Sequence, residues 1–304
     1  MSIWVCGEVL IDLLPGSPER LAVVGGGPAN TAKALARLGH DVQFIDGIST
    51  DEYGQSARAE LLADEVKLDL ALTSDKPTCL AIVTLAEDGS GSYEFKIDGT
   101  ATFDFSLDWL PDPSIHKPKV LHVGTLVTIV EPGATVLFDW ALQVAEFAPI
   151  VFDPNIRPSV MSDRDFYVAA VEKWSAISTV IKVSDDDLEW LYPGVDIETI
   201  ANRWIKDGAA LVVVTHGANG SIGFTASGRE EAEGVVVDVV DTVGAGDTVG
   251  AIIVEAMVQD GIMSLQNEGL AKVLKKSAAA AAITCSRAGA QPPYKHEVAK
   301  LKLD

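Results

Sequence analysis

Apolar residues follow two different spacings along the chain. Short uninterrupted apolar runs are typical of strands that helices cover on both faces, and apolar residues three or four positions apart are typical of helices. After Thr100 the two patterns alternate. Strands are predicted at 120–123, 150–152, 179–183 and 211–215, and helices at 134–147, 163–174 and 196–206. The alternation predicts an α/β fold with a doubly wound, mainly parallel sheet flanked by helices.

The two ends of the chain add elements to this sheet. Near the N-terminus, strands are predicted at 3–6 and 42–46, and helices from Pro28 to Gly39 and at 52–64. Towards the C-terminus, antiparallel strands are predicted at 221–225 and 235–239, and helices at 245–259 and 265–284. Because the sequence shows no internal repeat and no linker, we expect residues 1–304 to form a single domain.

Two separate segments, at about 9–24 and 76–98, have hairpin character instead. Pro15-Gly16 divides the first segment into two short strands. In the second, Asp88-Gly89 supplies a turn between an apolar run and a strand on which Tyr93, Phe95 and Ile97 alternate with polar residues. Since the two segments are alike, we expect them to form one small β-sheet that acts as a lid on the α/β core.

The charge of the chain limits its partners. Lys and Arg together number 23 and Asp and Glu together 44, which gives a net charge of −21. A nucleic acid or an anionic membrane would be repelled, so we exclude both and favour a small-molecule ligand. The N-terminus lacks a basic leader and a long apolar span, and the three cysteines lack a metal-ligand or disulfide spacing. These features predict a cytoplasmic protein.

The octapeptide DTVGAGDT, which begins at Asp241, lies between a predicted strand and a predicted helix. Small residues at Gly244, Ala245 and Gly246 expose consecutive backbone N–H groups at a helix N-terminus, where a phosphate can bind. Asp247 then stands beside this anion site, where its carboxylate can accept a proton from an attacking alcohol. An ordinary glycine turn with an aspartate at the helix start is the alternative explanation.

A second glycine cluster, GGGPAN, occupies residues 25–30. It does not match the dinucleotide-binding pattern GxGxxG, because Asn30 stands where the third glycine is required, and the chain contains no GxxxxGK[ST]. These departures argue against an NAD-dependent oxidoreductase. A tight turn that presents Asn30 to a polar ligand fits the residues better.

Together these motifs resemble those of the ribokinase-like (PfkB) carbohydrate kinases, and within that family those of the bacterial fructokinases. GGGPANTAKALARLG, from Gly25, resembles the first family motif, and DTVGAGDTVGA, from Asp241, resembles the second. The order of the predicted elements, including the lid, resembles the whole fold. The resemblance therefore implies a ribokinase-like α/β fold and an ATP-dependent sugar kinase.

The resemblance also implies roles for the residues at matching positions. Asp247 would take the proton from the sugar hydroxyl. The amides expected to hold the transferring phosphoryl group are those of Gly244, Ala245 and Gly246. The residues expected to hold the sugar are Asp12, Gly26, Gly27 and Asn30. Carboxylate and carboxamide groups supply the directed hydrogen bonds that sugar hydroxyls need, although Asp12 is also explained as a polar position before the Pro15 turn.

Further positions resemble the nucleotide and cation sites of the family. The residues expected beside ATP are Ser184, Thr215, Gly217, Gly220 and Ser277. Ser184 and Asp187 stand where the family has Asn and Glu. Asp187 is carried over as a residue that acts on Mg²⁺ through water, with an acidic helix start as the alternative. Asp241, Val243 and Gly289 resemble a monovalent cation site, which leaves K⁺ open as a cofactor beside ATP and Mg²⁺.

The sequence DPNIR, from Asp153, resembles fructokinases and 2-keto-3-deoxygluconate kinases more than ribokinases. Arg157 can bind a sugar oxygen or a substrate carboxylate, or pair with a neighbouring acid. The acidic chain and the opening GEVLIDLLP favour neutral fructose as the phosphoryl acceptor. The alternatives are 2-keto-3-deoxygluconate, then ribose or a nucleoside, and, in a different class, a non-catalytic sensor of sugar or nucleotide. Unpaired strand edges in the lid would allow a homodimer.

Overall fold

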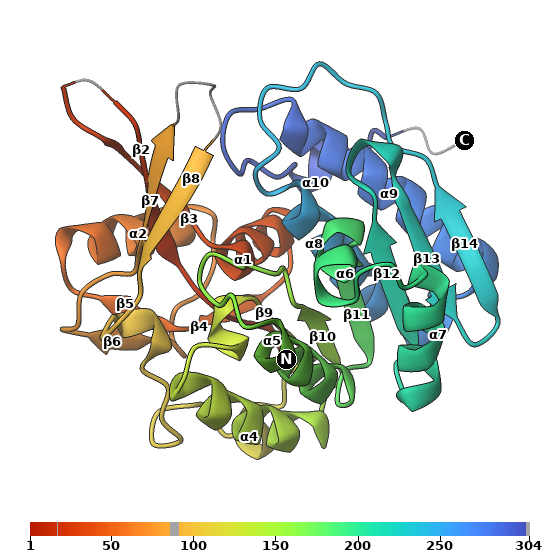
Figure 1. Cartoon of the computed structure of the whole chain (residues 1–304), viewed down its shortest axis with the longest axis horizontal. Helices are drawn as coiled ribbons and strands as arrows, with labels where there is room; N and C mark the ends of the chain where they lie inside the picture. Colours follow the sequence, from red (N-terminus) through yellow and green to blue (C-terminus); the bar gives the residue numbers. More distant parts are fainter. Residues whose placement is uncertain (17, 86–90, 302–304) are drawn as a thin grey trace.

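A large twisted sheet runs through the molecule (Figure 1). In the computed structural model, which describes residues 1–16, 18–85 and 91–301, eight strands form it in the order β14-β13-β12-β11-β10-β9-β1-β4. Their bounds are β1 (Ile3–Cys6), β4 (Val42–Ile45), β9 (Val120–Gly124), β10 (Ile150–Asp153), β11 (Val180–Ser184), β12 (Leu211–Thr215), β13 (Ser221–Thr225) and β14 (Gly228–Ala232). The strands from β12 to β4 pair in parallel, and β13 and β14 pair antiparallel.

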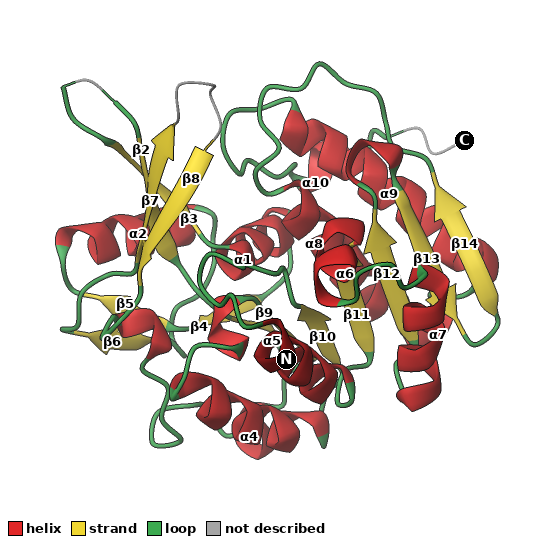
Figure 2. Cartoon of the chain, viewed as in Figure 1, coloured by secondary structure: helices red, strands yellow, loops and turns green. Residues whose placement is uncertain are grey.

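Helices cover both faces of this sheet (Figure 2). Their bounds are α1 (Gly27–Arg37), α2 (Glu52–Ala63), α3 (Pro113–His116), α4 (Gly133–Ala145), α5 (Arg164–Ser175), α6 (Asp185–Leu191), α7 (Ile197–Asp207), α8 (Ala245–Asp260), α9 (Asn267–Cys285) and α10 (Lys295–Val298). Alternate residues of β1 serve the two faces, because successive strand side chains point to opposite sides. Trp4 packs in a cluster with residues of α4, α5 and α7, and Ile3 and Val5 pack with α1, α8 and α9. The predicted doubly wound, mainly parallel sheet is confirmed.

A second sheet of four strands stands beside the first within the described part of the chain, in the order β3-β2-β7-β8. Its strands are β2 (Leu10–Leu14), β3 (Leu21–Gly25), β7 (Leu80–Leu85) and β8 (Gly91–Lys96). The two predicted hairpin segments meet where β2 and β7 pair in parallel, with Asp12 opposite Ala81. The prediction of one small sheet is confirmed, whereas the predicted Asp88-Gly89 turn lies outside the described residues. A further short pair, β5 (Gly47–Ser49) and β6 (Leu72–Ser74), was not predicted.

One predicted strand is wrong. The partner of β13 is β14, at 228–232, and not the apolar segment 235–239. Thr225 pairs with Gly228, so a tight turn follows β13 directly and the polar sequence GREEA forms the edge strand. Its outer position explains its polar composition, because an edge strand keeps much of its surface in water. Val236 is fully exposed, so the apolar run that suggested a strand does not enter the core.

No helix among residues 1–16, 18–85 and 91–301 is long and apolar enough to cross a membrane.

Candidate active site

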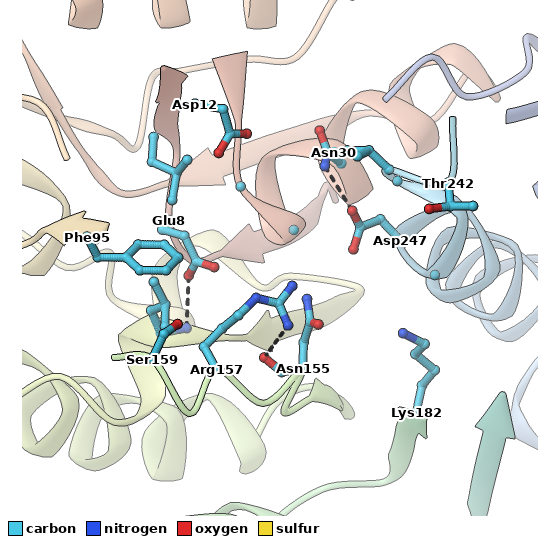
Figure 3. A pocket seen from close by; sticks show the side chains of 17 residues that line it. Glu8, Asp12, Asn30, Phe95, Asn155, Arg157, Ser159, Lys182, Thr242 and Asp247 are labelled. Carbon is cyan, nitrogen blue, oxygen red and sulfur yellow. Dashed lines mark hydrogen bonds between the residues drawn. The ribbon is translucent and has the colours of Figure 1, made fainter. Parts of the chain in front are cut away.

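A cavity of about 400 Å³ lies where the small sheet meets the first turns of α1 and α8 (Figure 3). The loop after β10 and Lys182 of β11 complete its walls. The labelled side chains that line it are Glu8, Asp12, Asn30, Phe95, Asn155, Arg157, Ser159, Lys182, Thr242 and Asp247. Nearly all of them carry charge or hydrogen-bonding groups, so the cavity suits a small polar ligand.

Asp247 lies in the first turn of α8 and faces the cavity. The helix follows Gly244, whose φ of 80° is in the left-handed region that favours glycine. The Asp247 side chain is buried, and one of its oxygens accepts a hydrogen bond from Asn30 Nδ2 at 2.9 Å. Burial raises the pKa of this carboxyl to about 6, while the positive charge of Lys182 opposes the rise. Asp247 is therefore a carboxylate with the moderately raised pKa expected of a general base.

The three residues before Asp247 differ in whether they face the cavity. Gly244 and Gly246 line the cavity, and Ala245 does not. The amide of Ala245 donates to the carbonyl oxygen of Thr242 at 3.2 Å, so this N–H already has an acceptor. Of the three predicted anion-binding amides, those of the two glycines are the better placed for a ligand.

Lys182 lines the cavity beside this glycine turn. It lies on β11 and is only 6% exposed. A Cβ added to Gly246 would lie 3.0 Å from Lys182 Nζ, so the ammonium group lies directly against the turn. Burial lowers the pKa of Lys182, but the nearby carboxylates, Asp153 above all, outweigh it and the pKa is raised. The lysine is therefore charged, and it can neutralise an anion bound at the start of α8.

Asp153 fixes the position of Lys182. Its Oδ2 accepts a hydrogen bond from Lys182 Nζ at 2.9 Å, and both side chains are buried. Asp153 is the last residue of β10, and Lys182 is the middle residue of the paired strand β11. Sequence reasoning considered Asp153 only as a neighbour of Arg157 and missed Lys182. The signal was present, because a lysine interrupts the otherwise apolar run VIKV.

The turn at Gly26 and Gly27 brings the start of α1 close to Asp247. Gly26 has a φ of 110°. A Cβ at Gly27 would lie 3.1 Å from Asn155 Nδ2 and 3.2 Å from Asp247 Oδ1. Side chains at these positions would fill the space between the two motifs. The structure thus brings together the predicted residues Gly26, Gly27 and Asn30 with Asp247.

Two further carboxylates lie at the small-sheet end of the cavity. Asp12 projects from β2, and its burial raises its pKa to about 6. Glu8 is 3% exposed and accepts a hydrogen bond from the Leu126 amide at 3.2 Å. Burial raises the pKa of Glu8 to about 7. Both side chains point into the cavity in Figure 3. Glu8, like Phe95, Asn155 and Ser159, was not assigned a role from the sequence.

Arg157 lies between these carboxylates and Asn155 (Figure 3). Its Nη1 donates to the carbonyl oxygens of Asn155 at 3.2 Å and Ile156 at 3.0 Å. Its charge lowers the pKa of Glu8, Asp12 and Asp247, yet it forms no ion pair with any carboxylate in the described part of the chain. The expected alternative of an ion pair with Asp153 does not occur, because Asp153 binds Lys182 instead.

The predicted nucleotide residues lie outside this cavity. Ser184 and Thr215 are opposite each other at the ends of β11 and β12. Gly217 and Gly220 bound the turn that follows, with φ of 53° and 101°. Ser277 is fully buried within α9, and its hydroxyl donates to the Val273 carbonyl oxygen. The ends of β11 and β12 thus group four of the five residues, and Ser277 lies on a different element, α9.

Ser184 and Asp187 cap α6 reciprocally. The amide of Asp187 donates to Ser184 Oγ at 3.0 Å, and the amide of Ser184 donates to Asp187 Oδ2 at 3.2 Å. Asp187 Oδ1 accepts from the Ile156 amide at 2.9 Å, which ties α6 to the loop that carries Arg157. Both oxygens of Asp187 thus have backbone donors, and the helix-start interpretation of this residue has direct support.

The three residues predicted for a monovalent cation lie together. Asp241 accepts hydrogen bonds from the amides of Val243 at 3.0 Å and Gly289 at 2.9 Å. The resulting turn is made of backbone groups and one carboxylate. Within the described ranges, no cluster of three or more His, Cys, Asp or Glu side chains has the geometry of a metal site.

Comparison with known proteins identifies the family of this chain. The model of the pfkB family of carbohydrate kinases matches residues 12–297. The chain belongs to this family. The family predicted from the two glycine motifs is therefore confirmed.

Individual members of the family are similar over most of the chain. A fructokinase from Rhizobium leguminosarum bv. trifolii is 34% identical over 267 residues, which cover 86% of this chain and 81% of that protein. The crystal structure of a fructokinase from Xylella fastidiosa with bound ATP has a TM-score of 0.89 and 26% identity, and the match covers 98% of this chain and 96% of that one. A fructokinase from Vibrio cholerae O395, bound to fructose, ADP and calcium, has a TM-score of 0.86 and 26% identity, with 98% and 97% of the chains covered.

Proposed function

We propose that this protein is an ATP-dependent fructokinase, which transfers the γ-phosphoryl group of ATP to a hydroxymethyl oxygen of fructose. The observation that carries the proposal is the position of Asp247, a buried carboxylate in the first turn of α8 that faces the cavity beside Gly246 and Lys182. Relatives named as fructokinases, and neighbours solved with ATP or with fructose and ADP, support the same chemistry.

In the proposed reaction, Asp247 removes the proton from the attacking hydroxyl as that oxygen bonds to the γ-phosphorus and the bond to ADP breaks. Asn30 orients the carboxylate through its 2.9 Å hydrogen bond. Lys182 and the amides of Gly244 and Gly246 at the start of α8 stabilise the charge on the transferring group. Asp12, Glu8 and Arg157 hold the remaining sugar hydroxyls, and the small sheet limits the access of water that would otherwise hydrolyse ATP.

We also propose Mg²⁺ as the divalent cofactor. Both oxygens of Asp187 accept backbone N–H groups, which hold the carboxylate in a fixed position from which it can bind water on the metal ion. When bound with ATP, the ion neutralises phosphate charge. For K⁺, the turn of Asp241, Val243 and Gly289 supplies oxygen ligands, which are the donors that such hard cations prefer.

The proposed setting is a cytoplasmic enzyme, with a homodimer formed through the small sheet. Strands β3 and β8 are the edges of that sheet, and Leu21 on β3 is 60% exposed. An unpaired edge with an exposed apolar side chain favours pairing with a second copy. Sedimentation of the purified protein tests this, since the substitution Leu21→Lys should shift a dimer towards monomer, and a monomeric wild type contradicts it.

A coupled assay of ADP release tests the proposed reaction. With ATP and Mg²⁺, we expect turnover with fructose to exceed that with 2-keto-3-deoxygluconate, ribose, glucose and adenosine. A different preferred sugar would keep the kinase chemistry and overturn the substrate. If no acceptor stimulates ADP release above a no-acceptor control, a non-catalytic sensor of sugar or nucleotide becomes the better proposal.

A further inference from the structure

We infer that the carboxylates of Glu8 and Asp12 make the sugar end of the cavity selective for neutral polyols and against sugar acids. The inference rests on the proposed function, because it concerns how the same cavity chooses its phosphoryl acceptor. Three side chains carry the argument: Glu8, Asp12 and Arg157. For each of them, the question is which atoms already have a hydrogen-bond partner within the protein.

Asp12 is the least satisfied of the three. Its carboxylate accepts no hydrogen bond from any residue that the structure describes, although the side chain is half-buried and faces the cavity. The side chain packs closely over Gly25, where an added Cβ would lie 2.2 Å from Asp12 Oδ2. The backbone of β3 thus holds the carboxylate in place without solvating it. A ligand that donates hydrogen bonds would satisfy it.

Glu8 contributes a second negative charge to the same end of the cavity. Its Oε2 is fixed by the Leu126 amide at 3.2 Å, and the residue is 3% exposed. A carboxylate at this depth is poorly screened by water, so its charge acts strongly on a ligand in the cavity.

Among the residues that the structure describes, Arg157 supplies the single positive charge at this end of the cavity. Its Nη1 binds two backbone carbonyl oxygens, and neither Glu8 nor Asp12 is close enough to form an ion pair with it. Lys182 belongs to the other end of the cavity, where its ammonium group lies against Gly246 and pairs with Asp153. With both carboxylates ionised, the three groups carry a net charge of −1, and Asp247 adds another negative charge nearby.

A neutral polyol matches this arrangement, because each hydroxyl can donate to a carboxylate and accept from the guanidinium. A sugar acid does not. Its carboxylate could bind Arg157 only while facing the negative charges of Glu8 and Asp12, and it has no proton to donate to them. Loss of one carboxylate charge would leave the guanidinium available for a bidentate contact with an acid.

The test compares fructose with 2-keto-3-deoxygluconate as acceptors in the full-length protein. Asp12→Asn removes the charge and keeps the shape, and Asp12→Glu keeps the charge and changes the shape. Asp207→Asn, at an exposed position on α7, matches the change in net charge away from the cavity. Assays at pH 8 keep the carboxyls ionised, because the raised pKa values of Glu8 and Asp12 are about 7 and about 6.

We expect Asp12→Asn to shift the ratio of kcat/KM for fructose to kcat/KM for the sugar acid by at least about tenfold towards the acid. Asp12→Glu and Asp207→Asn should leave the preference for fructose intact. An unchanged ratio in Asp12→Asn, or equal shifts in Asp12→Asn and Asp12→Glu, would overturn the inference.

Calorimetric titration of the same variants with 2-keto-3-deoxygluconate, without ATP, separates this inference from the proposed function. If the wild type fails to phosphorylate fructose, the proposed function fails, and tighter binding of the acid to Asp12→Asn than to wild type still supports selection by charge. If wild type and Asp12→Asn bind the acid equally tightly, the inference of selection by charge is overturned. Thermal unfolding of each variant verifies that it is folded.

Discussion

The charged groups at the two ends of the cavity are held in opposite ways. At the α8 end, Lys182 pairs with Asp153 and Asn30 binds Asp247, each at 2.9 Å. At the small-sheet end, Asp12 has no hydrogen-bond donor in the described part of the chain, and Arg157 binds only backbone carbonyls. The first set is fixed before a ligand arrives. At the second end the Leu126 amide fixes Glu8, but Asp12 and Arg157 have bonding capacity left for a ligand.

This difference assigns the two ends to different tasks. Groups that stabilise charge in a transition state act best when neighbouring groups already hold them in place. Groups that recognise a polyol must instead leave their hydrogen-bonding atoms to the ligand. Variants at the α8 end should therefore lower kcat, and variants at the small-sheet end should mainly raise the KM for fructose.

The largest effect is expected from Asp247→Asn. The amide is similar in size but cannot take the hydroxyl proton, so kcat should fall by about 10²–10⁴-fold. Steady-state ADP release at saturating ATP and fructose measures it, and the melting temperature serves as the folding control. Activity within tenfold of wild type would remove Asp247 from the role of base.

The next largest effect is expected from Lys182. A single Lys182→Met would leave Asp153 buried and unpaired, which costs about 3–5 kcal/mol of stability. The double variant Lys182→Met with Asp153→Asn avoids this. Its kcat should fall by about 10²-fold, because one stabilising charge beside the transferring group is lost. Asp153→Asn alone is the control, and an equal loss of activity in that control would assign the effect to Asp153.

At the other end of the cavity, Arg157→Gln should raise the KM for fructose by about 10–100-fold, because hydrogen bonds to a charged group contribute about 1.5–3 kcal/mol. The fall in kcat should be smaller than that caused by the Lys182 double variant. Initial rates over a range of fructose concentrations separate the two constants. A purely catalytic defect, with KM unchanged, would contradict the assignment of this end to sugar binding.

A smaller effect is expected in the pH dependence of kcat/KM for fructose, to which both ends of the cavity contribute. The pKa values of Glu8, at about 7, and of Asp12 and Asp247, at about 6, are raised by burial, and each group acts in its ionised form. Below about pH 7 these groups bind protons, so kcat/KM for fructose should fall as the pH falls and level off above pH 8.

Glu8→Gln removes the group with the highest of these pKa values, so the fall in its profile should begin nearer pH 6. An identical profile in wild type and Glu8→Gln would show that ionisation of Glu8 does not control substrate binding.

Sequence patterns predicted the parts of this molecule that depend on local order. Buried parallel strands appear in the sequence as apolar runs, and the helices appear as apolar residues at helical spacing. The motifs around Asn30 and Asp247 are each contained in a short continuous stretch of sequence. Both motifs line the cavity. The small sheet was predicted because its two segments share the sequence pattern of a hairpin.

Features that depend on tertiary contacts were missed. Lys182 and Asp153 come from neighbouring strands and pair only in the folded sheet. The unsatisfied carboxylate of Asp12 and the position of Glu8 reflect the packing of β3 and of the loop after β9. The apolar segment 235–239 misled the strand prediction, because hydrophobicity alone does not determine which segment pairs with β13.

Product analysis is the most direct test of phosphoryl transfer to fructose. The wild-type protein is incubated with ATP, Mg²⁺ and fructose, and ADP and sugar phosphate are quantified together by mass spectrometry. We predict one fructose phosphate for each ADP, with negligible ADP when fructose is omitted. ADP without a matching amount of fructose phosphate would mean that water is the acceptor and would contradict the account.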